Sequence, residues 1–161
     1  MRRMLPRSPL MLLATLSMAV PSQAWCQSDM EEGIRQTVID LYVSIRENLV
    51  DTSDGYSADG ALSFWSSGGL LQEVGNQITP ERYDSYNVFP KHIQVIRLTE
   101  ESGVAQFYAE GSYKPVEGET VSHYLTRVTH VYVLEGGAWK LRAAHFSPVL
   151  GGSGTHATSV K

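Results

Sequence analysis

The chain has a single cysteine, Cys26, among its 161 residues. One cysteine cannot form a disulfide within the chain, so a folded domain here must be stabilised by its hydrophobic core alone. The chain also lacks an apolar run of the roughly 20 residues that a membrane-spanning helix needs. Its longest candidate, from Leu10 to Val20, is shorter and is followed by Pro21. We therefore expect no membrane-spanning anchor.

The first 26 residues have the order of a secretory signal peptide, with a basic start, an apolar stretch and small residues at the end. Three arginines precede the apolar run, and Ser22 and Ala24 stand at the two positions that a signal peptidase reads. We predict that residues 1–26 are a signal peptide cut after Ala24 or Cys26, and that the mature protein is periplasmic or secreted. Trp25 is a poor residue before a lipidated cysteine, so we do not expect a lipoprotein.

Basic residues are scarce once this leader is removed. The chain has 13 Lys and Arg against 17 Asp and Glu, and loss of the three leader arginines leaves a formal net charge of −7. A nucleic-acid partner requires a basic surface that displaces counterions from phosphates. Anionic membrane surfaces also attract basic segments. The composition therefore argues against nucleic acid as a partner, and against membrane binding after signal cleavage.

The remaining chain of roughly 135 residues is long enough for one domain with a single core. Residues 28–49 predict an amphipathic helix with Ser28 or Asp29 as its N-terminal cap. Asp40 lies off the apolar face and is expected to be solvated. The apolar face consists of Ile34, Val38, Leu41, Tyr42, Ile45 and Leu49, which recur at helical spacing.

The middle of the chain gives weaker signals. Residues 50–60 contain Asp-Gly twice and indicate turns. Residues 61–75 fit either the end of a helix or short strands, interrupted by Gly68-Gly69. Pro80 is typical of a first helical turn, so residues 81–86 are predicted to form a short helix.

From Pro90 onward apolar residues alternate with polar ones, which is the pattern of β-strands. Residues 92–99, 104–113 and the long hairpin 121–148 predict four consecutive strands, most simply an antiparallel meander. Gly136-Gly137 favours a tight two-residue turn, because such turns need positive φ. Residues 150–161 have nothing to bury and are predicted to be a disordered tail. A helix followed by an antiparallel sheet defines an α+β fold.

Several motifs resemble the nuclear transport factor 2-like superfamily, in particular its SnoaL-like branch. They are Arg127-Val128, Gly137-x-Trp139, His145-x-Ser147 and the segment around Pro90 and His92. Over residues 31–148 the pattern is similar to the calcium/calmodulin-dependent kinase association domain and its stand-alone bacterial relatives. The resemblance implies that residues 27–149 form a cone-like barrel, in which a curved antiparallel sheet wraps around the N-terminal helix and leaves a pocket. It also implies dimerisation through the outer sheet face, so we expect a homodimer.

Arg127 is the first candidate for ligand binding. An arginine within an apolar strand must reach water or an anionic partner, because an unpaired buried charge is unfavourable. The resemblance implies that Arg127 points into the pocket, where its guanidinium suits a carboxylate ligand. The alternatives are an internal ion pair with Glu110 or Glu73, or a solvated outer face.

His145 is the candidate catalytic residue, because histidine exchanges a proton near neutral pH. Its relation to Arg127 depends on the register of the hairpin. A clean two-residue turn pairs Arg127 with Phe146 and places Arg127 and His145 on opposite faces of the sheet. A bulge beside the turn would bring them onto one face. The sequence leaves both registers open.

Tyr108 and Trp65 complete the predicted ligand-binding residues, with Tyr108 as a hydrogen-bond donor. We expect no metal site, because His130 and His145 share a face in the clean register without a carboxylate to complete one. No phosphate-binding glycine loop is present, and Ser66 lacks the glycine elbow of a serine hydrolase. We therefore expect no cofactor.

These residues support three functions. The first is an exported domain that binds a small molecule between the sheet and the first helix, with an anionic group of the ligand near Arg127. The second is a lyase or isomerase that uses a pocket histidine and a tyrosine. The third is an oligomerisation module.

Overall fold

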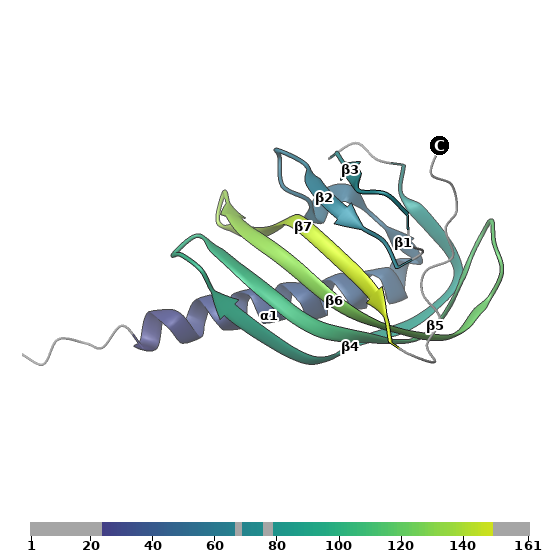
Figure 1. Ribbon diagram of the computed structural model, residues 1–161, viewed down its shortest axis with the longest axis horizontal. Helices are drawn as coiled ribbons and strands as arrows, with labels where there is room; N and C mark the ends of the chain where they lie inside the picture. Colours follow the sequence, from purple (N-terminus) through teal and green to yellow (C-terminus); the bar gives the residue numbers. More distant parts are fainter. Residues whose placement is uncertain (1–23, 67–68, 76–78, 150–161) are drawn as a thin grey trace, which may run out of the picture.

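The structure is a computed structural model that describes residues 24–66, 69–75 and 79–149. Over these residues the chain forms one long helix and a sheet whose seven strands follow the order β1-β4-β5-β6-β7-β2-β3 (Figure 1). Residues 1–23 of the predicted signal peptide and the predicted tail from residue 150 lie outside the described residues. No helix among the described residues is long and apolar enough to span a membrane.

Helix α1 (Ala24–Asn48) confirms the predicted amphipathic helix, although it begins before the predicted cap residues. Ile34 and Val38 are fully buried, and Tyr42 and Ile45 are nearly so, while Asp40 is exposed. Burial of this single face is what holds the helix on the sheet, because apolar area removed from water stabilises the folded state.

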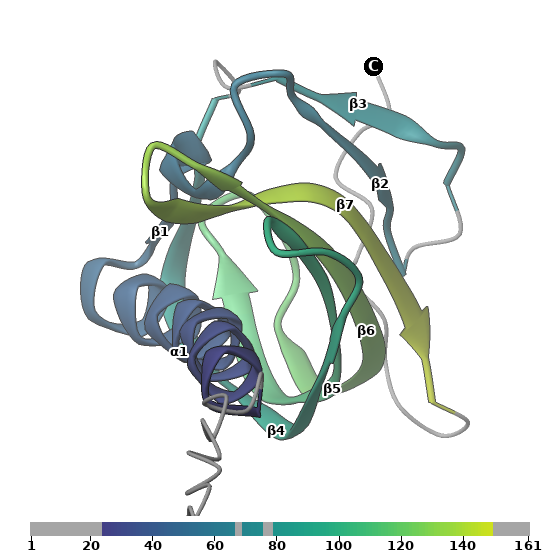
Figure 2. The same cartoon turned by 90° about the vertical axis from the view of Figure 1, so that its left-hand side faces the viewer.

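Four long strands curl around that face of α1. They are β4 (Glu81–Arg97), β5 (Ser102–Pro115), β6 (Val121–Glu135) and β7 (Ala138–Pro148). Each pairs antiparallel with the next, so the predicted meander is confirmed. Figure 2 shows the sheet curled into a half-barrel with α1 along its open side. The predicted α+β arrangement of a curved sheet around a long N-terminal helix is therefore confirmed.

The start of β4 corrects one prediction. Residues 81–86, predicted to be a short helix, form the first part of this 17-residue strand. Tyr83 pairs with Pro115 of β5, and its ring packs into the core beneath α1. Tertiary packing of aromatic residues, which favour strands, outweighs the local helix signal of Pro80.

Short strands complete the two edges of the sheet. After β1 (Val50–Asp51) comes the 3-10 turn η1 (Ser53–Gly55), followed by β2 (Ala61–Phe64) and β3 (Gln72–Val74). β1 pairs with the outer edge of β4, and β2 runs parallel to β7. Residues 61–75 therefore contain strands rather than a helix end, and the sheet is mixed rather than wholly antiparallel.

Local irregularities accompany the curvature of the long strands. The β4–β5 pairing shifts between Lys91 and Gln94, where His92 has a positive φ of 54°. Gly111 in β5 has a φ of 151°, and a side chain there would overlap the backbone oxygen of Asn87. Bulges of this kind bend a strand and increase its twist.

The β6–β7 hairpin contains the bulge that the sequence left open. Leu134 pairs with Trp139 beside the turn, but the pairing shifts between Val131 and Tyr132, so that Arg127 pairs with Ser147 and Thr129 with His145. Arg127 and His145 therefore share one face. The opposite face is the buried one, and it carries Tyr124, Thr126, Val128, His130 and Tyr132. The bulge thus brings Arg127 and His145 together on the outer face.

Candidate functional site

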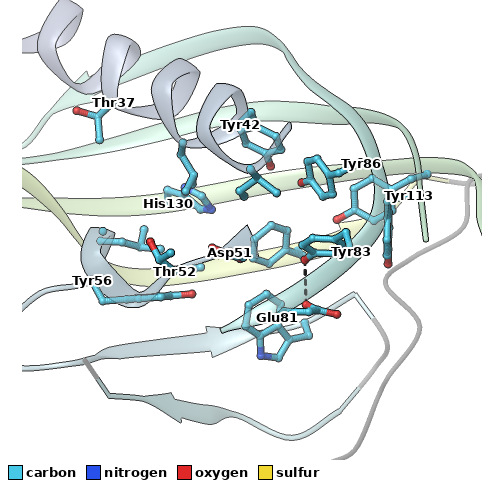
Figure 3. A pocket seen from close by; sticks show the side chains of 18 of the residues that line it. Thr37, Tyr42, Asp51, Thr52, Tyr56, Glu81, Tyr83, Tyr86, Tyr113 and His130 are labelled. Carbon is cyan, nitrogen blue, oxygen red and sulfur yellow. Dashed lines mark hydrogen bonds between the residues drawn. The ribbon is translucent and has the colours of Figure 1, made fainter. Parts of the chain in front are cut away.

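A cavity of about 110 Å³ lies between the C-terminal half of α1 and the concave face of the sheet (Figure 3). Seven of the eight tyrosines of the chain line it: Tyr42, Tyr56, Tyr83, Tyr86, Tyr113, Tyr124 and Tyr132. On β4 the register shift between Tyr83 and Ser85 allows Tyr83 and Tyr86, which are three residues apart, to face the same side. Apolar side chains, including Ile45, Leu141 and Phe146, fill much of the remaining wall.

Asp51 and Glu81 are the acidic residues of the cavity lining. They stand directly opposite each other in the β1–β4 pairing, so their side chains lie on the same face of the sheet. The Tyr83 hydroxyl donates a hydrogen bond of 3.0 Å to Glu81 Oε2, shown as a dashed line in Figure 3. Two carboxylates in this position repel each other, and burial disfavours the ionised form of each.

Both carboxyl groups have raised pKa values. Burial, followed by the charge of Glu81, raises the pKa of Asp51 to about 7. Burial also raises the pKa of Glu81, although the hydrogen bond from Tyr83 lowers it in part. Interacting carboxyl groups lose their protons in coupled steps, so the pair exchanges a proton near neutral pH. Acids with such a pKa inside a cavity are candidates for proton transfer or for binding a cation.

His130 is the third polar feature of the cavity. The side chain is 1% exposed, and its Nδ1 lies 3.1 Å from the Tyr132 hydroxyl. The Nε2 atom is buried and has no hydrogen-bond partner among the described residues. Burial lowers the pKa of His130 to about 3, so the imidazole is neutral at physiological pH. A buried nitrogen without a partner is unusual and marks a position where a polar ligand atom would be stabilised.

Of the predicted ligand-binding residues, Trp65 lies at the cavity and Arg127 does not. Trp65 is part of the lining, and its ring stacks on Phe146 with centroids 5.2 Å apart. Arg127 is exposed on the outer face, where it donates 3.1 Å hydrogen bonds to Ser147 Oγ and to the carbonyl of Pro148. The outer-face alternative for Arg127 is therefore the one that the structure shows.

Tyr108 and His145 also lie on the outer face. Tyr108 is 42% exposed and meets the ring of His92 edge-on. His145 is exposed and meets the ring of Phe64 edge-on. The lining of the cavity beside α1 includes neither residue. His145 does lie near Trp65 outside that cavity, because both residues line a second pocket formed by the ends of β2 and β7.

No sequence pattern predicted Asp51 and Glu81 as residues of the site. Asp51 stands in a segment of turn residues, and Glu81 begins a segment predicted to be helical. Only the pairing of β1 with β4 brings them together. For His130 a signal did exist, because it alternates with Val128 and Tyr132 on one side of β6.

A metal centre is not indicated in the described part of the chain. His, Cys, Asp and Glu side chains there form no group of three or more that could hold a metal ion. The cavity lining contains Asp51, Glu81 and His130, whose chemistry suits hydrogen bonding, proton exchange and the binding of a cationic group.

Replacement of Asp51 by Asn should stabilise the protein at pH 8 more than at pH 5. The folded pKa of Asp51 is raised, so its contribution to stability is present below about pH 4 and is lost as the pH rises through about 7. The variant avoids that loss, and we expect a gain of about 1–3 kcal/mol in the free energy of unfolding at pH 8. Urea unfolding of the wild type and the variant at pH 5 and pH 8 measures this difference in the free energy of unfolding. The exposed Asp59→Asn variant serves as the control, and an equal gain at both pH values would contradict the assignment.

No protein-family model matches the chain, and no curated protein matches it. Solved structures do match. An NTF2-like protein of unknown function from Pseudomonas putida KT2440 has a TM-score of 0.52 and 18% identity, covering 74% of this chain and 87% of that chain. The association domain of C. elegans CaMKII has a TM-score of 0.51 and 15% identity, covering 74% of this chain and 98% of that chain.

The CamKII hub homology domain of Chlamydomonas reinhardtii has a TM-score of 0.51 and 15% identity, covering 73% of this chain and 97% of that chain. Identities this low establish the fold and leave the function open. The chain has the nuclear transport factor 2-like fold, with association-domain relatives among its structural neighbours, as the motifs of the last two strands predicted.

Proposed function

We propose that the protein binds a small molecule with an apolar body in the cavity between α1 and the sheet. One observation carries the proposal: the walls are largely tyrosine and apolar side chains, yet Asp51, Glu81 and His130 converge on the same space. Apolar pockets with a few convergent polar groups are the usual form of small-molecule sites. The leader predicted from the sequence supports a periplasmic or secreted setting for this activity.

The size of the cavity limits the ligand. Its volume of about 110 Å³ is somewhat smaller than the roughly 150 Å³ of a cavity that holds benzene. The ligand therefore has at most one ring inside the cavity.

The charge of the cavity argues against the anionic ligand expected from the sequence. Arg127, the residue expected to bind it, is on the outer face with Ser147 and Pro148 as its hydrogen-bond partners. No lysine or arginine of the described residues lines the cavity, and an anion would meet Asp51 and Glu81. We therefore propose a neutral or cationic ligand.

Proton transfer, as in a lyase or isomerase, is a second candidate function. The observation that favours it is the carboxyl pair, in which Asp51 has a pKa of about 7 and Glu81 is bonded to Tyr83. A carboxylate in such a site can remove a proton from carbon, while a tyrosine hydroxyl hydrogen-bonds to the oxygen that gains negative charge. His145 lies on the outer face, so Asp51 and Glu81 take the role of base in this proposal.

Homo-oligomerisation is a third candidate and does not depend on the cavity. The outer face exposes large apolar side chains on β2, β4 and β5, and exposed apolar surface marks interaction sites on soluble proteins where it is contiguous. They are Phe64, Phe89, Ile96 and Tyr108. The association and hub domains that share this fold are consistent with such a role. We propose a homodimer formed through this face.

Filling the cavity should abolish ligand binding. Ala144 is buried in the cavity wall, and its neighbour Ala143 lies on the opposite face of β7. In a thermal-shift screen of neutral, cationic and anionic single-ring molecules, we expect hits with the wild type that Ala144→Leu loses. Ala143→Leu and Arg127→Ala should keep them. Loss of the same hits in Arg127→Ala alone would contradict the location of the site.

The proton-transfer function can be tested with an enolisable ketone. Cyclohexanone in deuterated buffer should exchange the hydrogens next to its carbonyl faster with protein than without, as followed by proton NMR. We expect Asp51→Asn and Glu81→Gln to lower the enzymatic rate by about 100-fold or more. His145→Gln should leave it unchanged. If cyclohexanone exchanges its hydrogens no faster with the wild-type protein than in buffer alone, proton transfer on ketones of that size is ruled out.

If the protein is a homodimer, its sedimentation coefficient at micromolar concentration should be that of a particle with the mass of two chains. Tyr108→Glu introduces a charge on the outer face and should shift the protein to the monomer. Leu70→Glu changes an 83% exposed side chain in the β2–β3 connection and should leave the dimer intact. A wild-type protein that stays monomeric at high concentration would rule the dimer out.

A further inference from the structure

We propose that the ligand of the cavity is a small organic ammonium ion, whose N–H groups bind Asp51 and Glu81 and whose body packs against the tyrosine rings. This inference rests on the proposed binding function and names the ligand class. Three independent features carry it: the uncompensated acids, the aromatic wall beside them and the buried nitrogen of His130.

Within the part of the chain that the structure describes, no cationic side chain pairs with the acids of the cavity. Arg35–Glu32, Arg97–Glu100 and Lys114–Asp84 are ion pairs of the described residues, and they involve neither Asp51 nor Glu81. Neither lysine nor arginine contributes to the cavity lining over residues 24–66, 69–75 and 79–149. Both acids are half-buried. Partial removal of unpaired carboxylates from water is unfavourable, so a proton or a cation stabilises the pair. A ligand with one positive charge supplies that cation.

Aromatic rings stand beside the acids in the arrangement that an organic cation prefers. The ring centroids of Tyr83 and Tyr86 are 4.8 Å apart, and Tyr113 meets Tyr83 edge-on at 5.8 Å. Figure 3 shows Tyr83 beside Asp51 and Glu81, with Tyr86 and Tyr113 on the same side of the cavity. The negative faces of such rings attract ammonium groups, more strongly where water is excluded.

His130 supplies a second point of attachment. His130 is 1% exposed and lines the same cavity. Its Nε2 atom has no hydrogen-bond partner among the described residues. The ring is neutral because burial lowers its pKa to about 3, so it does not repel a cation. A hydroxyl or carbonyl on the ligand would satisfy this nitrogen.

A neutral ligand of the same shape accounts for fewer of these features. It would pack on the tyrosines and could reach His130, yet it would leave the charge of Asp51 and Glu81 uncompensated above neutral pH. A cation becomes more favourable as the pair loses its proton, whereas a neutral molecule does not. The two classes therefore differ in how binding depends on pH.

The titration near the site belongs to the two carboxyl groups. Asp51 faces Glu81 of β4 together with tyrosines of α1, the η1 region and β4. These tyrosines have raised pKa values because of burial, so they stay neutral at pH 6–8, as does His130. They are Tyr42, Tyr56, Tyr83 and Tyr86. With a pKa of about 7 for Asp51, the affinity for an ammonium ion should rise roughly tenfold from pH 6 to pH 8.

Benzylamine, benzyl alcohol and benzoate form a matched set of cationic, neutral and anionic probes. Their binding to the full chain at pH 6 and pH 8 can be measured by ligand-observed NMR. We expect benzylamine to bind at least tenfold more tightly than the other two at pH 8, and to lose roughly tenfold at pH 6. The ammonium group itself stays protonated over this range, as lysine does.

Variants that remove a carboxylate but keep the size of the side chain distinguish the effect of charge on binding from the effect of cavity shape. Asp51→Asn and Glu81→Gln should each weaken benzylamine by tenfold or more and change benzyl alcohol little. Glu110→Gln removes an exposed carboxylate on the outer face and should change neither. The comparison of the three probes on the wild type stands even if one cavity variant fails to fold.

Equal or tighter binding of benzyl alcohol or benzoate would overturn the ammonium class and leave the binding function intact. The same holds if none of the three binds while the broader screen finds only neutral or anionic ligands that Ala144→Leu loses. If no ligand of any class depends on Ala144, both the binding function and this inference fail.

Discussion

Packing of α1 into the concave face of the sheet is the constraint on which the rest of the structure depends. Toward its N-terminus the contact is close: a side chain at Gly103 would collide with Ile34, and one at Gly33 with Trp139. Toward the C-terminus the helix is fastened by Arg46, which donates a 2.8 Å hydrogen bond to the carbonyl of Val88. The cavity lies along the C-terminal half of α1. The close packing of the N-terminal half fixes the position of the helix, although the space beside the C-terminal half is not filled by side chains.

The chemistry of the cavity follows from its position inside the cone. β1 is only two residues long, yet it places Asp51 opposite Glu81 in a largely aromatic surrounding. Such a pair lowers stability at neutral pH, because both carboxyl groups are half-buried and neither has an ion-pair partner among the residues that the structure describes. Groups that weaken a fold while lining its pocket are characteristic of functional sites. Arg127, by contrast, reaches Ser147 and Pro148 at the surface and has an ordinary structural explanation.

Several features of the fold could be predicted because their signals are local. The apolar face of α1 repeats at helical spacing, and Gly136-Gly137 requires a tight turn, so both are visible in the residues themselves. The segment after Pro80 was wrongly predicted as a helix, because the burial of Tyr83 beneath α1 is a long-range effect. Of the residues predicted for the site, Trp65 does line the cavity. The positions of Asp51 and Glu81 and the inward direction of His130 could not be predicted, because they depend on pairings between strands that are distant in the sequence.

The sequence by itself determined the long helix, the four-stranded meander, the tight hairpin and the resemblance to the superfamily, since each depends on spacing along the chain. Only the tertiary structure decided which face of that hairpin is inside. The bulge between Val131 and Tyr132 sets the register, and burial of Tyr124, Val128 and Tyr132 against α1 sets the direction. Because adjacent residues of a strand point to opposite faces, this choice carries Arg127 and His145 outward and His130 inward. The direction of a strand face depends on what packs against it, and that partner is distant in the sequence.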